Sequence, residues 1–448
     1  MTNSRRLIVV GGIAAGLSAA SRARRLDPTL RVDVYERTGY CAYSACGLPY
    51  VIGGVIPDHE SLVMRTPAEF ADEGVNIHLG HEITDIDGDR GTASLRNTSS
   101  GQALTESFDE LVLATGGKPI VPFAADAQGC FVVKTMEDGL RLRSFLAEKR
   151  PRSAVIIGGG YIGLEMAEAL LRKRVRVTLL ERLPHVLSLV DDAIAVEIER
   201  ELDQLGVVVK TGCDVTGVEA SSHGLVVTSQ QGQFPCDVVV IGIGIEPQCE
   251  LAHDAGIALG PHGGIVVDAE MHTSHAAIWA AGDCCETKHL LHEQSAYIPL
   301  GTTANKHGRV AGSNIGGAHE FFGGVVGTAV IKVCDLQIGR TGLSEREARD
   351  VGFEPVVTQI THASRARYYP DWTPMTVRMV ADPRSGRLLG AQIAGREGVA
   401  KRIDVIATAL HAGLTVDEVA SLDLSYAPPF APVWDPILVA ARRTAELV

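Results

Sequence analysis

Short apolar runs alternate with longer amphipathic stretches in the first part of the chain. An apolar run over residues 7–10 leads into a glycine-rich turn and then into an alanine-rich stretch that ends at Leu26. A second apolar run over 31–35 follows and ends at Glu36. Two short apolar runs separated by a helical stretch predict parallel strands joined by a helix, because strands covered on both faces carry few polar residues.

The same order of elements occurs a second time. Apolar residues 154–157 precede a glycine-rich turn, a helix that we expect to end near Arg172, and a strand over 176–180 that ends at Glu181. Each copy is a strand–turn–helix–strand unit with an acidic residue at its end. This order is typical of a dinucleotide-binding unit, and its repetition makes a chance match improbable.

Three further apolar runs end at or beside a glycine, over residues 111–113, 237–241 and 278–281. We expect them to be the closing strands of the two parallel sheets. After about residue 321 the pattern changes to apolar–polar alternation, which predicts an antiparallel sheet over 329–333, 355–359 and 376–379. Two helices are expected to follow, over 401–411 and 416–422.

The second glycine turn has the spacing that a bound pyrophosphate requires. Gly158 permits the tight turn, Gly160 lets the backbone approach the phosphates, and Gly163 allows the helix to pack closely on the strand. The carboxylate of Glu181 is expected to bind both ribose hydroxyls and to repel a 2′-phosphate, which favours NADH. Arg182 could bind such a phosphate, so NADPH is possible.

The first glycine turn is less regular, because Ile13 occupies the place of the middle glycine. Two dinucleotide units in one chain indicate one cofactor that stays bound and one that visits. From this first unit we expect a cofactor site to include Gly11, Gly12, Ala14, Gly16, Glu36 and Arg37.

Composition narrows the classes of function. The 448 residues suggest about three domains. A net charge of −13 without a basic run predicts neither nucleic-acid nor anionic-membrane partners. We expect a cytoplasmic protein, because no window is apolar enough for a signal or a membrane helix. Nine scattered cysteines do not form a disulfide framework, and no metal site is predicted.

Several segments resemble the pyridine nucleotide–disulfide oxidoreductases. Gly282-Asp283 after a buried strand looks like that family's FAD-ribitol motif, and the segment 114–117 is similar to its short strand-end motif. Cys46-Gly47-Leu48-Pro49-Tyr50 resembles the active-site segment of the coenzyme A disulfide reductase and NADH oxidase branch. The likeness continues through 368–370 and 426–436, so it covers essentially the whole chain.

The resemblance implies an α/β fold with two Rossmann-like dinucleotide-binding domains, for FAD and NAD(P), and a C-terminal α+β dimerisation domain. We expect the FAD domain to span 1–118 and 250–320, the NAD(P) domain 119–249, and the dimerisation domain 321–448. The resemblance also implies a homodimer.

The resemblance assigns roles to further residues. Catalytic residues are expected to be Cys46 together with Tyr426 and Tyr368. The two tyrosines would reach in from the partner subunit, and their phenols would protonate the departing thiolate. Further cofactor contacts are expected from Thr115, Gly116, Asp283, Thr303, Tyr161, Ile162, Glu165 and Gly244. Substrate contacts are expected from Arg22, Arg25 and Asn305.

The sequence leaves the electron acceptor open. Cys46 could reduce a disulfide, a persulfide or a polysulfide, or cycle through a sulfenic acid with oxygen as acceptor. The same motifs would also suit a flavin carrier that reduces a partner redox protein, or a non-catalytic redox sensor. Ala14 stands where the family's peroxidases carry a histidine, which argues against peroxide as the main substrate. Ala45 and Trp434 depart from the family's coenzyme A-binding pattern, so the sequence also leaves open whether the substrate contains coenzyme A.

Cys41 lies five positions before Cys46, the spacing of two-cysteine reductases. The other motifs of those enzymes are absent, and we interpret Cys41 as a buried apolar residue at a strand end. The start of a nearby helix, or an oxidised flavin, is expected to favour the thiolate of Cys46.

Overall fold

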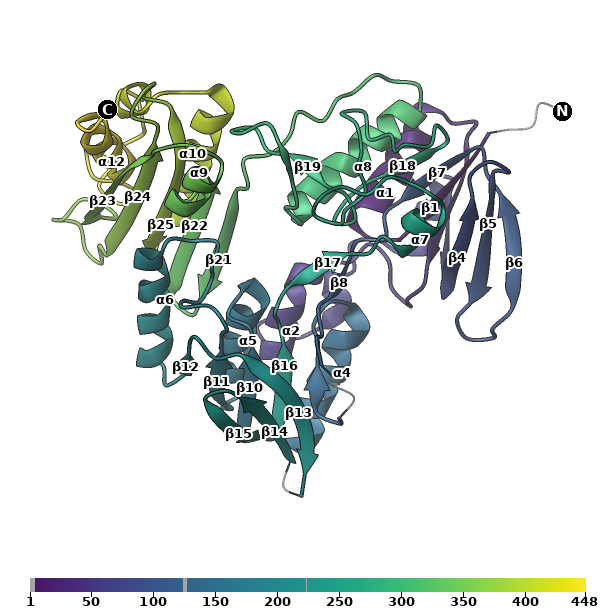
Figure 1. Cartoon of the computed structure of the whole chain (residues 1–448), viewed down its shortest axis with the longest axis horizontal. Helices are drawn as coiled ribbons and strands as arrows, with labels where there is room; N and C mark the ends of the chain where they lie inside the picture. Colours follow the sequence, from purple (N-terminus) through teal and green to yellow (C-terminus); the bar gives the residue numbers. More distant parts are fainter. Residues whose placement is uncertain (1–4, 124–126, 223) are drawn as a thin grey trace.

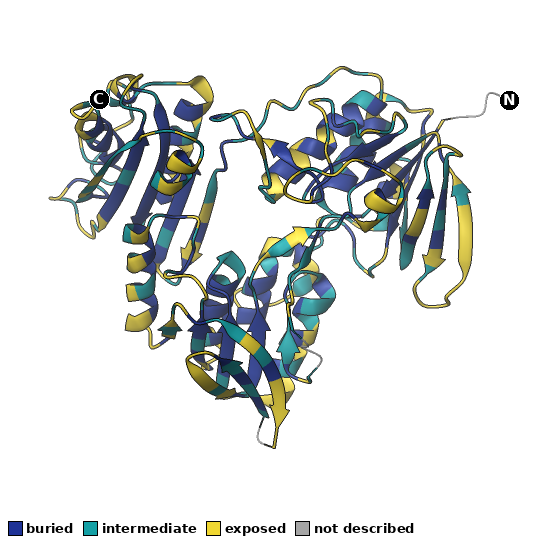
Figure 2. Cartoon of the chain, in the orientation of Figure 1, coloured by how far each residue is buried: buried dark blue, intermediate teal, exposed yellow. Residues whose placement is uncertain are grey.

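The computed structural model describes residues 5–123, 127–222 and 224–448. Three lobes are visible in Figure 1, two of them built on parallel sheets and the third on an antiparallel sheet. The central strands of each sheet are buried, whereas the outer faces of the surrounding helices are exposed (Figure 2). The α/β class and the C-terminal antiparallel domain are therefore as the sequence predicts.

The first lobe contains a five-stranded parallel sheet in the order β18-β7-β1-β2-β3. Two helices, α1 and α8, lie side by side on it. A Cβ atom added at Gly308 or Gly312 of α8 would collide with backbone oxygens of α1, so these glycines permit the close contact. The elements of the core are β1 (Arg6–Val10), α1 (Ala14–Leu26), β2 (Arg31–Glu36), β3 (Val75–Leu79), β7 (Glu110–Leu113), β18 (Ile278–Ala280) and α8 (Gly301–Ile315).

The second lobe repeats this design with the parallel order β12-β11-β10-β16-β9. Its elements are β9 (Cys130–Phe131), α4 (Met136–Lys149), β10 (Ser153–Ile157), α5 (Tyr161–Arg172), β11 (Arg176–Leu180), α6 (Asp192–Gln204), β12 (Val208–Lys210) and β16 (Val238–Ile241). The two-stranded ribbon of β8 (Gly117–Pro119) and β17 (Ile245–Pro247) carries the chain between the two lobes.

The third lobe is an antiparallel sheet in the order β21-β22-β25-β24-β23, with helices packed against it. Its elements are β21 (Ala329–Val333), β22 (Leu336–Gly342), α9 (Glu345–Asp350), β23 (Val356–Ala363), β24 (Pro374–Ala381), β25 (Leu388–Gly395), α10 (Val399–Ala412), α11 (Val416–Ala420) and α12 (Pro436–Ala445).

Smaller elements complete the chain. They are η1 (Ala45–Gly47), α2 (Leu48–Gly53), η2 (His59–Leu62), α3 (Pro67–Asp72), β4 (His81–Asp87), β5 (Thr92–Asn97), β6 (Ala103–Ser107), β13 (Val215–Ser221), β14 (Gly224–Ser229), β15 (Gly232–Cys236), α7 (Glu250–Asp254), β19 (Thr287–Lys288) and β20 (Ser295–Ala296). Both three-stranded antiparallel sheets, β4-β5-β6 and β13-β14-β15, are additions to the parallel lobes.

Two strands lie at other positions than the sequence suggests. The pattern predicts the runs at 111–113 and 237–241 as closing strands, but β7 and β16 are internal strands. The edge strands are β18 and β3 in the first sheet, and β12 and β9 in the second. The run at 278–281 is therefore a closing strand as predicted, whereas β9 has two residues, too few to produce a periodic signal. From the strands in each sheet, we propose the boundaries 1–118 with 250–320, 119–249 and 321–448 for the three domains.

Among the helices of the described ranges, none combines the length and the apolar character that crossing a bilayer would require.

Candidate active site

The first glycine turn connects β1 to α1 and lies against the end of β2. Gly11 has a φ of 109°, a conformation that favours glycine, and an added Cβ there would collide with Ala114. The amide of Gly12 donates a 2.8 Å hydrogen bond to Glu36 Oε2. The turn and the acidic strand end therefore form one unit, which also contains Ala14 and Gly16 at the start of α1.

The second turn repeats this geometry between β10 and α5. Gly158 has a φ of 102°, and Gly163 packs against its backbone without room for a side chain. The amide of Gly159 donates to Glu181 Oε2 at 2.6 Å, and the amide of Leu183 donates to Oε1 at 2.8 Å. At Gly160 an added Cβ would have its nearest neighbour 3.9 Å away, so the space that a pyrophosphate needs is open.

The helices that follow these turns have N-termini suited to anions. Neither α1 nor α5 has a side-chain cap or an acidic residue in its first turn, and the same is true of α8. By contrast, α3 and α4 close their N-termini with capping boxes. Uncapped amides and the positive end of the helix dipole attract phosphate, so α1 and α5 fit the diphosphates of FAD and NAD(P)H.

The strand ends of the first lobe converge on the same edge. Thr115 Oγ1 donates to the backbone oxygen of Gln248 at 2.6 Å, and Arg37 reaches the side-chain oxygen of Gln248 at 3.2 Å. Gly116 has a φ of 71°, and an added Cβ there would meet nothing within 4 Å. Asp283 lies just beyond the end of β18. In parallel sheets, ligands bind at this carboxyl edge.

A buried histidine supports the Gly282-Asp283 motif. The amide of Gly282 donates to His307 Nδ1 at 3.4 Å, and burial lowers the pKa of His307 to about 4, so the ring is neutral at pH 7. His307 lies on α8, as does the buried Thr303. Nothing in the sequence distinguishes His307 from other helical histidines.

Cys46 lies where the chain enters α2. It is the central residue of η1, which runs directly into α2, and its side chain is exposed. By contrast, Cys41 is 2% exposed, lies in the loop after β2 rather than at a strand end, and belongs to the core of the first lobe. All nine cysteines are free, so Cys41 and Cys46 do not form a disulfide here.

Charged side chains of the first and second lobes lie near Cys46. Although residue Cys46 is exposed, the protein atoms around its sulfur desolvate the thiol and raise its pKa; Glu165 and Asp283 raise the pKa further, while Lys134 lowers it. Burial, with Glu168 nearby, raises the pKa of Glu165 to about 7. Lys134 Nζ lies 3.4 Å from Asp283 Oδ2. That the helix start or an oxidised flavin favours the thiolate of Cys46 stays a prediction.

The other cysteines near the site are structural. Cys284 and Cys285 are buried, with their sulfurs 3.8 Å apart, and Cys249 donates to the backbone oxygen of Cys284. The pKa of Cys285 is well above the usual range because of burial. These residues pack behind the Asp283 turn.

Tyr368 and Tyr426 meet at the surface of the third lobe. Their phenolic oxygens are 2.9 Å apart, and their residues are 75% and 45% exposed. Phe430 and Trp434 are also exposed near Tyr426 in the sequence. This aromatic surface belongs to the lobe that the sequence identifies as a dimerisation domain.

The three predicted substrate residues lie on α1 and α8. Arg25 is exposed, and Asn305 Oδ1 accepts a 2.8 Å bond from Ser18. Arg22 is held by Ser313 Oγ at 2.8 Å and by Glu320 at 2.9 Å. Arg22 would thus have to leave Glu320 to bind a substrate phosphate, and all three assignments stay predictions.

The remaining predicted residues lie around the second turn. Tyr161 and Ile162 begin α5, and burial raises the pKa of Tyr161. Gly244 has a φ of 121° between β16 and β17.

Comparison with known families agrees with this geometry. Residues 5–308 match the family described as pyridine nucleotide-disulphide oxidoreductase, and residues 328–436 match the dimerisation domain of that family. The chain belongs to the pyridine nucleotide-disulphide oxidoreductases. It is thus a pyridine nucleotide-dependent oxidoreductase, a flavoprotein of a family that uses FAD and NAD(P)H, and it carries a dimerisation domain.

Within this family, several of the similar proteins carry names that refer to sulfur compounds. It is 38% identical over 439 residues to "NAD(P)H sulfur oxidoreductase (CoA-dependent)" of Pyrococcus abyssi, with 97% of each chain covered. The solved NAD-dependent persulfide reductase of A. fulgidus is 36% identical with a TM-score of 0.95, covering 98% of this chain and 83% of that one. The reduced CoADR-RHD of Bacillus anthracis is 35% identical with a TM-score of 0.96, covering 99% and 81%.

Three residues around the site escaped the sequence analysis. Lys134 precedes α4 and gives no motif, Gln248 is a loop residue, and His307 lies within a helix. Each acquires its position through a contact distant in sequence, such as Lys134 with Asp283.

Proposed function

We propose that this protein is an FAD-dependent NAD(P)H reductase that acts on a disulfide, a persulfide or a polysulfide, with Cys46 as the reacting thiol. The observation that carries the proposal is the exposed Cys46 in η1, just before α2. Glu165 and Lys134 are near enough to change the pKa of its thiol. Three relatives of similar length, each 37–38% identical, are described as sulfur oxidoreductases or as a polysulfide/persulfide reductase, which supports the same substrate class. A relative described as an NADH oxidase is less similar, at 33% identity.

The sulfur chemistry of Cys46 is a thiol–disulfide exchange. Its thiolate attacks one sulfur of R–S–S–R′, a Cys46–S–S–R bond forms, and R′–S⁻ leaves. Two electrons from NAD(P)H then break the mixed disulfide and restore the Cys46 thiolate as R–SH is released. In sum, NAD(P)H, one proton and R–S–S–R′ give NAD(P)⁺, R–SH and R′–SH, and with a persulfide R′–SH is H₂S.

The residues of the two turns would hold the cofactors. The start of α1, with Glu36 and Asp283, is suited to FAD, and the start of α5 with Glu181 is suited to NAD(P)H. Bound FAD would supply the redox centre that accepts a hydride and delivers the electron pair. Lys134 would lower the pKa of the Cys46 thiol, which Glu165 raises.

The leaving thiolate needs a proton. In a homodimer that uses the aromatic surface of the third lobe, Tyr368 and Tyr426 of one copy would serve Cys46 of the other. Their mutual hydrogen bond keeps a phenolic proton at the surface of the lobe. Arg25, together with Arg22 once released from Glu320, would bind the phosphates of a coenzyme A-type substrate.

Steady-state NADH and NADPH consumption tests the proposal, measured anaerobically with coenzyme A disulfide, coenzyme A persulfide and polysulfide, and separately in air. We expect anaerobic turnover with at least one of the three sulfur compounds, and its loss in Cys46→Ser. Consumption only in air would identify an NADH oxidase instead. Consumption only with an added redox protein, unaffected by Cys46→Ser, would identify an electron carrier.

A further inference from the structure

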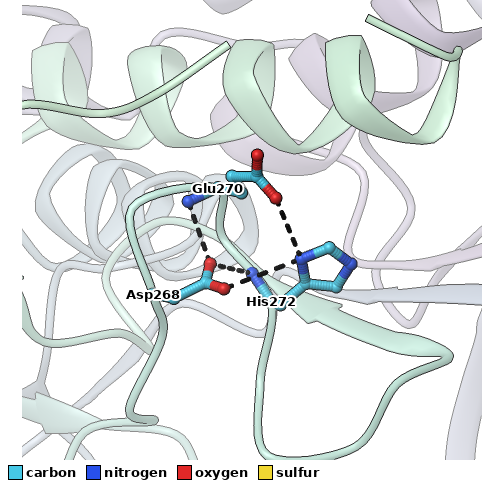
Figure 3. Close-up of side chains that lie close together, drawn as sticks. All are labelled: Asp268, Glu270 and His272. Carbon is cyan, nitrogen blue, oxygen red and sulfur yellow. Dashed lines mark hydrogen bonds and ion pairs between the residues drawn. The ribbon is translucent and has the colours of Figure 1, made fainter. Parts of the chain in front are cut away.

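A group of metal-ligand side chains lies on the loop that leads into β18, outside the site around Cys46. Asp268, Glu270 and His272 point toward one another in Figure 3, and one ligand atom of each lies within 4.8 Å of the other two. These side chains have no part in the dinucleotide sites or in the sulfur chemistry proposed above.

The spacing of the three groups is that of metal ligands rather than of hydrogen-bond partners. His272 Nδ1 lies 3.8 Å from Asp268 Oδ2 and 3.8 Å from Glu270 Oε2. Both distances exceed a hydrogen bond. Two atoms bound to one Zn²⁺ ion at about 2.1 Å are roughly 3.5 Å apart, so little movement would bring these atoms onto a shared ion.

The ligand atoms are oriented by neighbouring groups. Asp268 Oδ1 accepts the amides of Glu270 and His272, each at 2.9 Å, which leaves Oδ2 directed to the imidazole. The His272 ring stacks on Trp279 with centroids 3.4 Å apart, and this contact fixes its plane. Outer contacts of this kind orient ligands in metal sites and strengthen binding.

A second histidine approaches from a different segment. His319 Nδ1, in the loop after α8, is 3.9 Å from Glu270 Oε1. Asn314 ties the two segments together, because its side-chain nitrogen donates to the backbone oxygens of Glu270 at 3.0 Å and Glu320 at 2.9 Å. His319 therefore lies beside the group, at the other oxygen of Glu270 from the one that faces His272.

The negative charge of the group lacks a basic partner. In the portion of the chain that the structure describes, Asp268 and Glu270 form ion pairs with histidines only, and not with lysine or arginine. A divalent cation would neutralise both carboxylates. Because imidazole nitrogen is a ligand for zinc-like ions rather than for calcium or magnesium, the ligand set also selects the class of metal.

We propose that Asp268, Glu270 and His272 form a surface site for a divalent transition ion of the Zn²⁺ class. The ion would fix the loop that leads into β18.

Calorimetric titration of the purified, chelator-treated flavoprotein with Zn²⁺ tests the proposal. We expect saturable binding of one ion per chain, weakened at least about tenfold in His272→Ala and in Asp268→Asn. His253→Ala is the matched control, because His253 is exposed beside a single carboxylate, Asp254, at 3.2 Å. The control should bind Zn²⁺ as the parent does.

The nine free thiols require a second readout, since thiolates also bind Zn²⁺. The zinc X-ray absorption spectrum should show nitrogen and oxygen ligands without sulfur, and Cys46→Ser should retain binding. A sulfur-ligated spectrum, binding that survives His272→Ala, or the absence of saturable binding would each overturn the proposal. All of these outcomes are independent of NAD(P)H turnover.

Discussion

The phenolic oxygens of Tyr368 and Tyr426 lie 2.9 Å apart although the two residues are 58 positions apart in the sequence. The bond joins the loop after β23 to the loop before α12 on an exposed face of the dimerisation domain. The hydrogen bond with Tyr368 raises the pKa of Tyr426, and its phenol is protonated at neutral pH, as ordinary phenols are. One phenol can therefore donate a proton, and the other phenol can either replace that proton or stabilise the oxygen that has lost it.

Replacement Tyr426→Phe should slow reduction of the sulfur substrate by about 10² because the leaving thiolate loses its proton donor. Reduction of the flavin by NADH should stay within about twofold of the parent rate. Rapid mixing, with the two half-reactions followed separately, measures both. Tyr368→Phe should give a smaller effect, since Tyr426 would remain. Equal slowing of the two half-reactions in Tyr426→Phe would contradict the acid role.

Opposite charges around Cys46 predict opposite changes in its reactivity. Lys134→Met should raise the pKa of the Cys46 thiol, which leaves less thiolate at pH 8 and slows alkylation by iodoacetamide. Glu165→Gln should lower the pKa of the thiol and speed the same reaction, because at pH 8 the Glu165 carboxylate is ionised.

The pH dependence of the initial alkylation rate measures both shifts of the Cys46 pKa. Its alkylation profile should move to higher pH in Lys134→Met and to lower pH in Glu165→Gln. Shifts in the same direction would show that packing rather than charge controls Cys46.

A buried ion pair supports the segment that carries Tyr426. Arg402 and Asp435 are 1% and 3% exposed, and the guanidinium nitrogen lies 3.0 Å from the carboxylate. Asp435→Ala would leave the Arg402 charge buried and unpaired, so it should lower the free energy of unfolding by about 3–5 kcal/mol. Denaturant unfolding measures this loss.

The exposed pair Arg443–Glu446, with N–O distance 3.0 Å, is the matched control for Asp435→Ala. Arg443→Ala should change the free energy of unfolding by less than about 1 kcal/mol. Comparable losses in the two variants would mean that burial of the Arg402 pair is unimportant.

Glu181 should set the choice of nucleotide. Its carboxylate is held by the amides of Gly159 and Leu183 just beyond β11, the strand end at which dinucleotide-binding units carry the acid for the ribose. Glu181→Ala should therefore lower the ratio of kcat/KM for NADH to kcat/KM for NADPH by at least about tenfold. The control is Asp203→Asn, which replaces an exposed residue on α6 and should leave the ratio unaltered. A ratio unchanged in Glu181→Ala would exclude Glu181 as the determinant.

Periodicity and turn chemistry predicted the parallel units well. The strands at 7–10 and 31–35 and the helix to Leu26 correspond to β1, β2 and α1, because both buried strands and glycine turns leave local signals in sequence. The hairpins β4–β6 and β13–β15 were missed, since each mixes exposed polar residues with few buried ones. Their stability comes from cross-strand pairing and packing, which intrinsic propensity reflects poorly.

Only the site residues that lie within recognisable motifs could be predicted from the sequence. Gly11, Gly158 and Asp283 lie at strand ends, where local sequence determines the turn. Lys134 beside Asp283, and Tyr368 beside Tyr426, depend on how separate elements pack. The pKa of Cys46 depends on the same packing, because partial burial and Glu165 raise it and Lys134 lowers it.

The central claim is that electrons from NAD(P)H reach the substrate through the sulfur of Cys46. Anaerobic turnover of the Cys46→Ser flavoprotein with a persulfide or coenzyme A disulfide tests it most directly, alongside bleaching of its flavin by NADH. The account predicts rapid bleaching with turnover reduced at least about 10³-fold. Turnover close to that of the parent protein would contradict it.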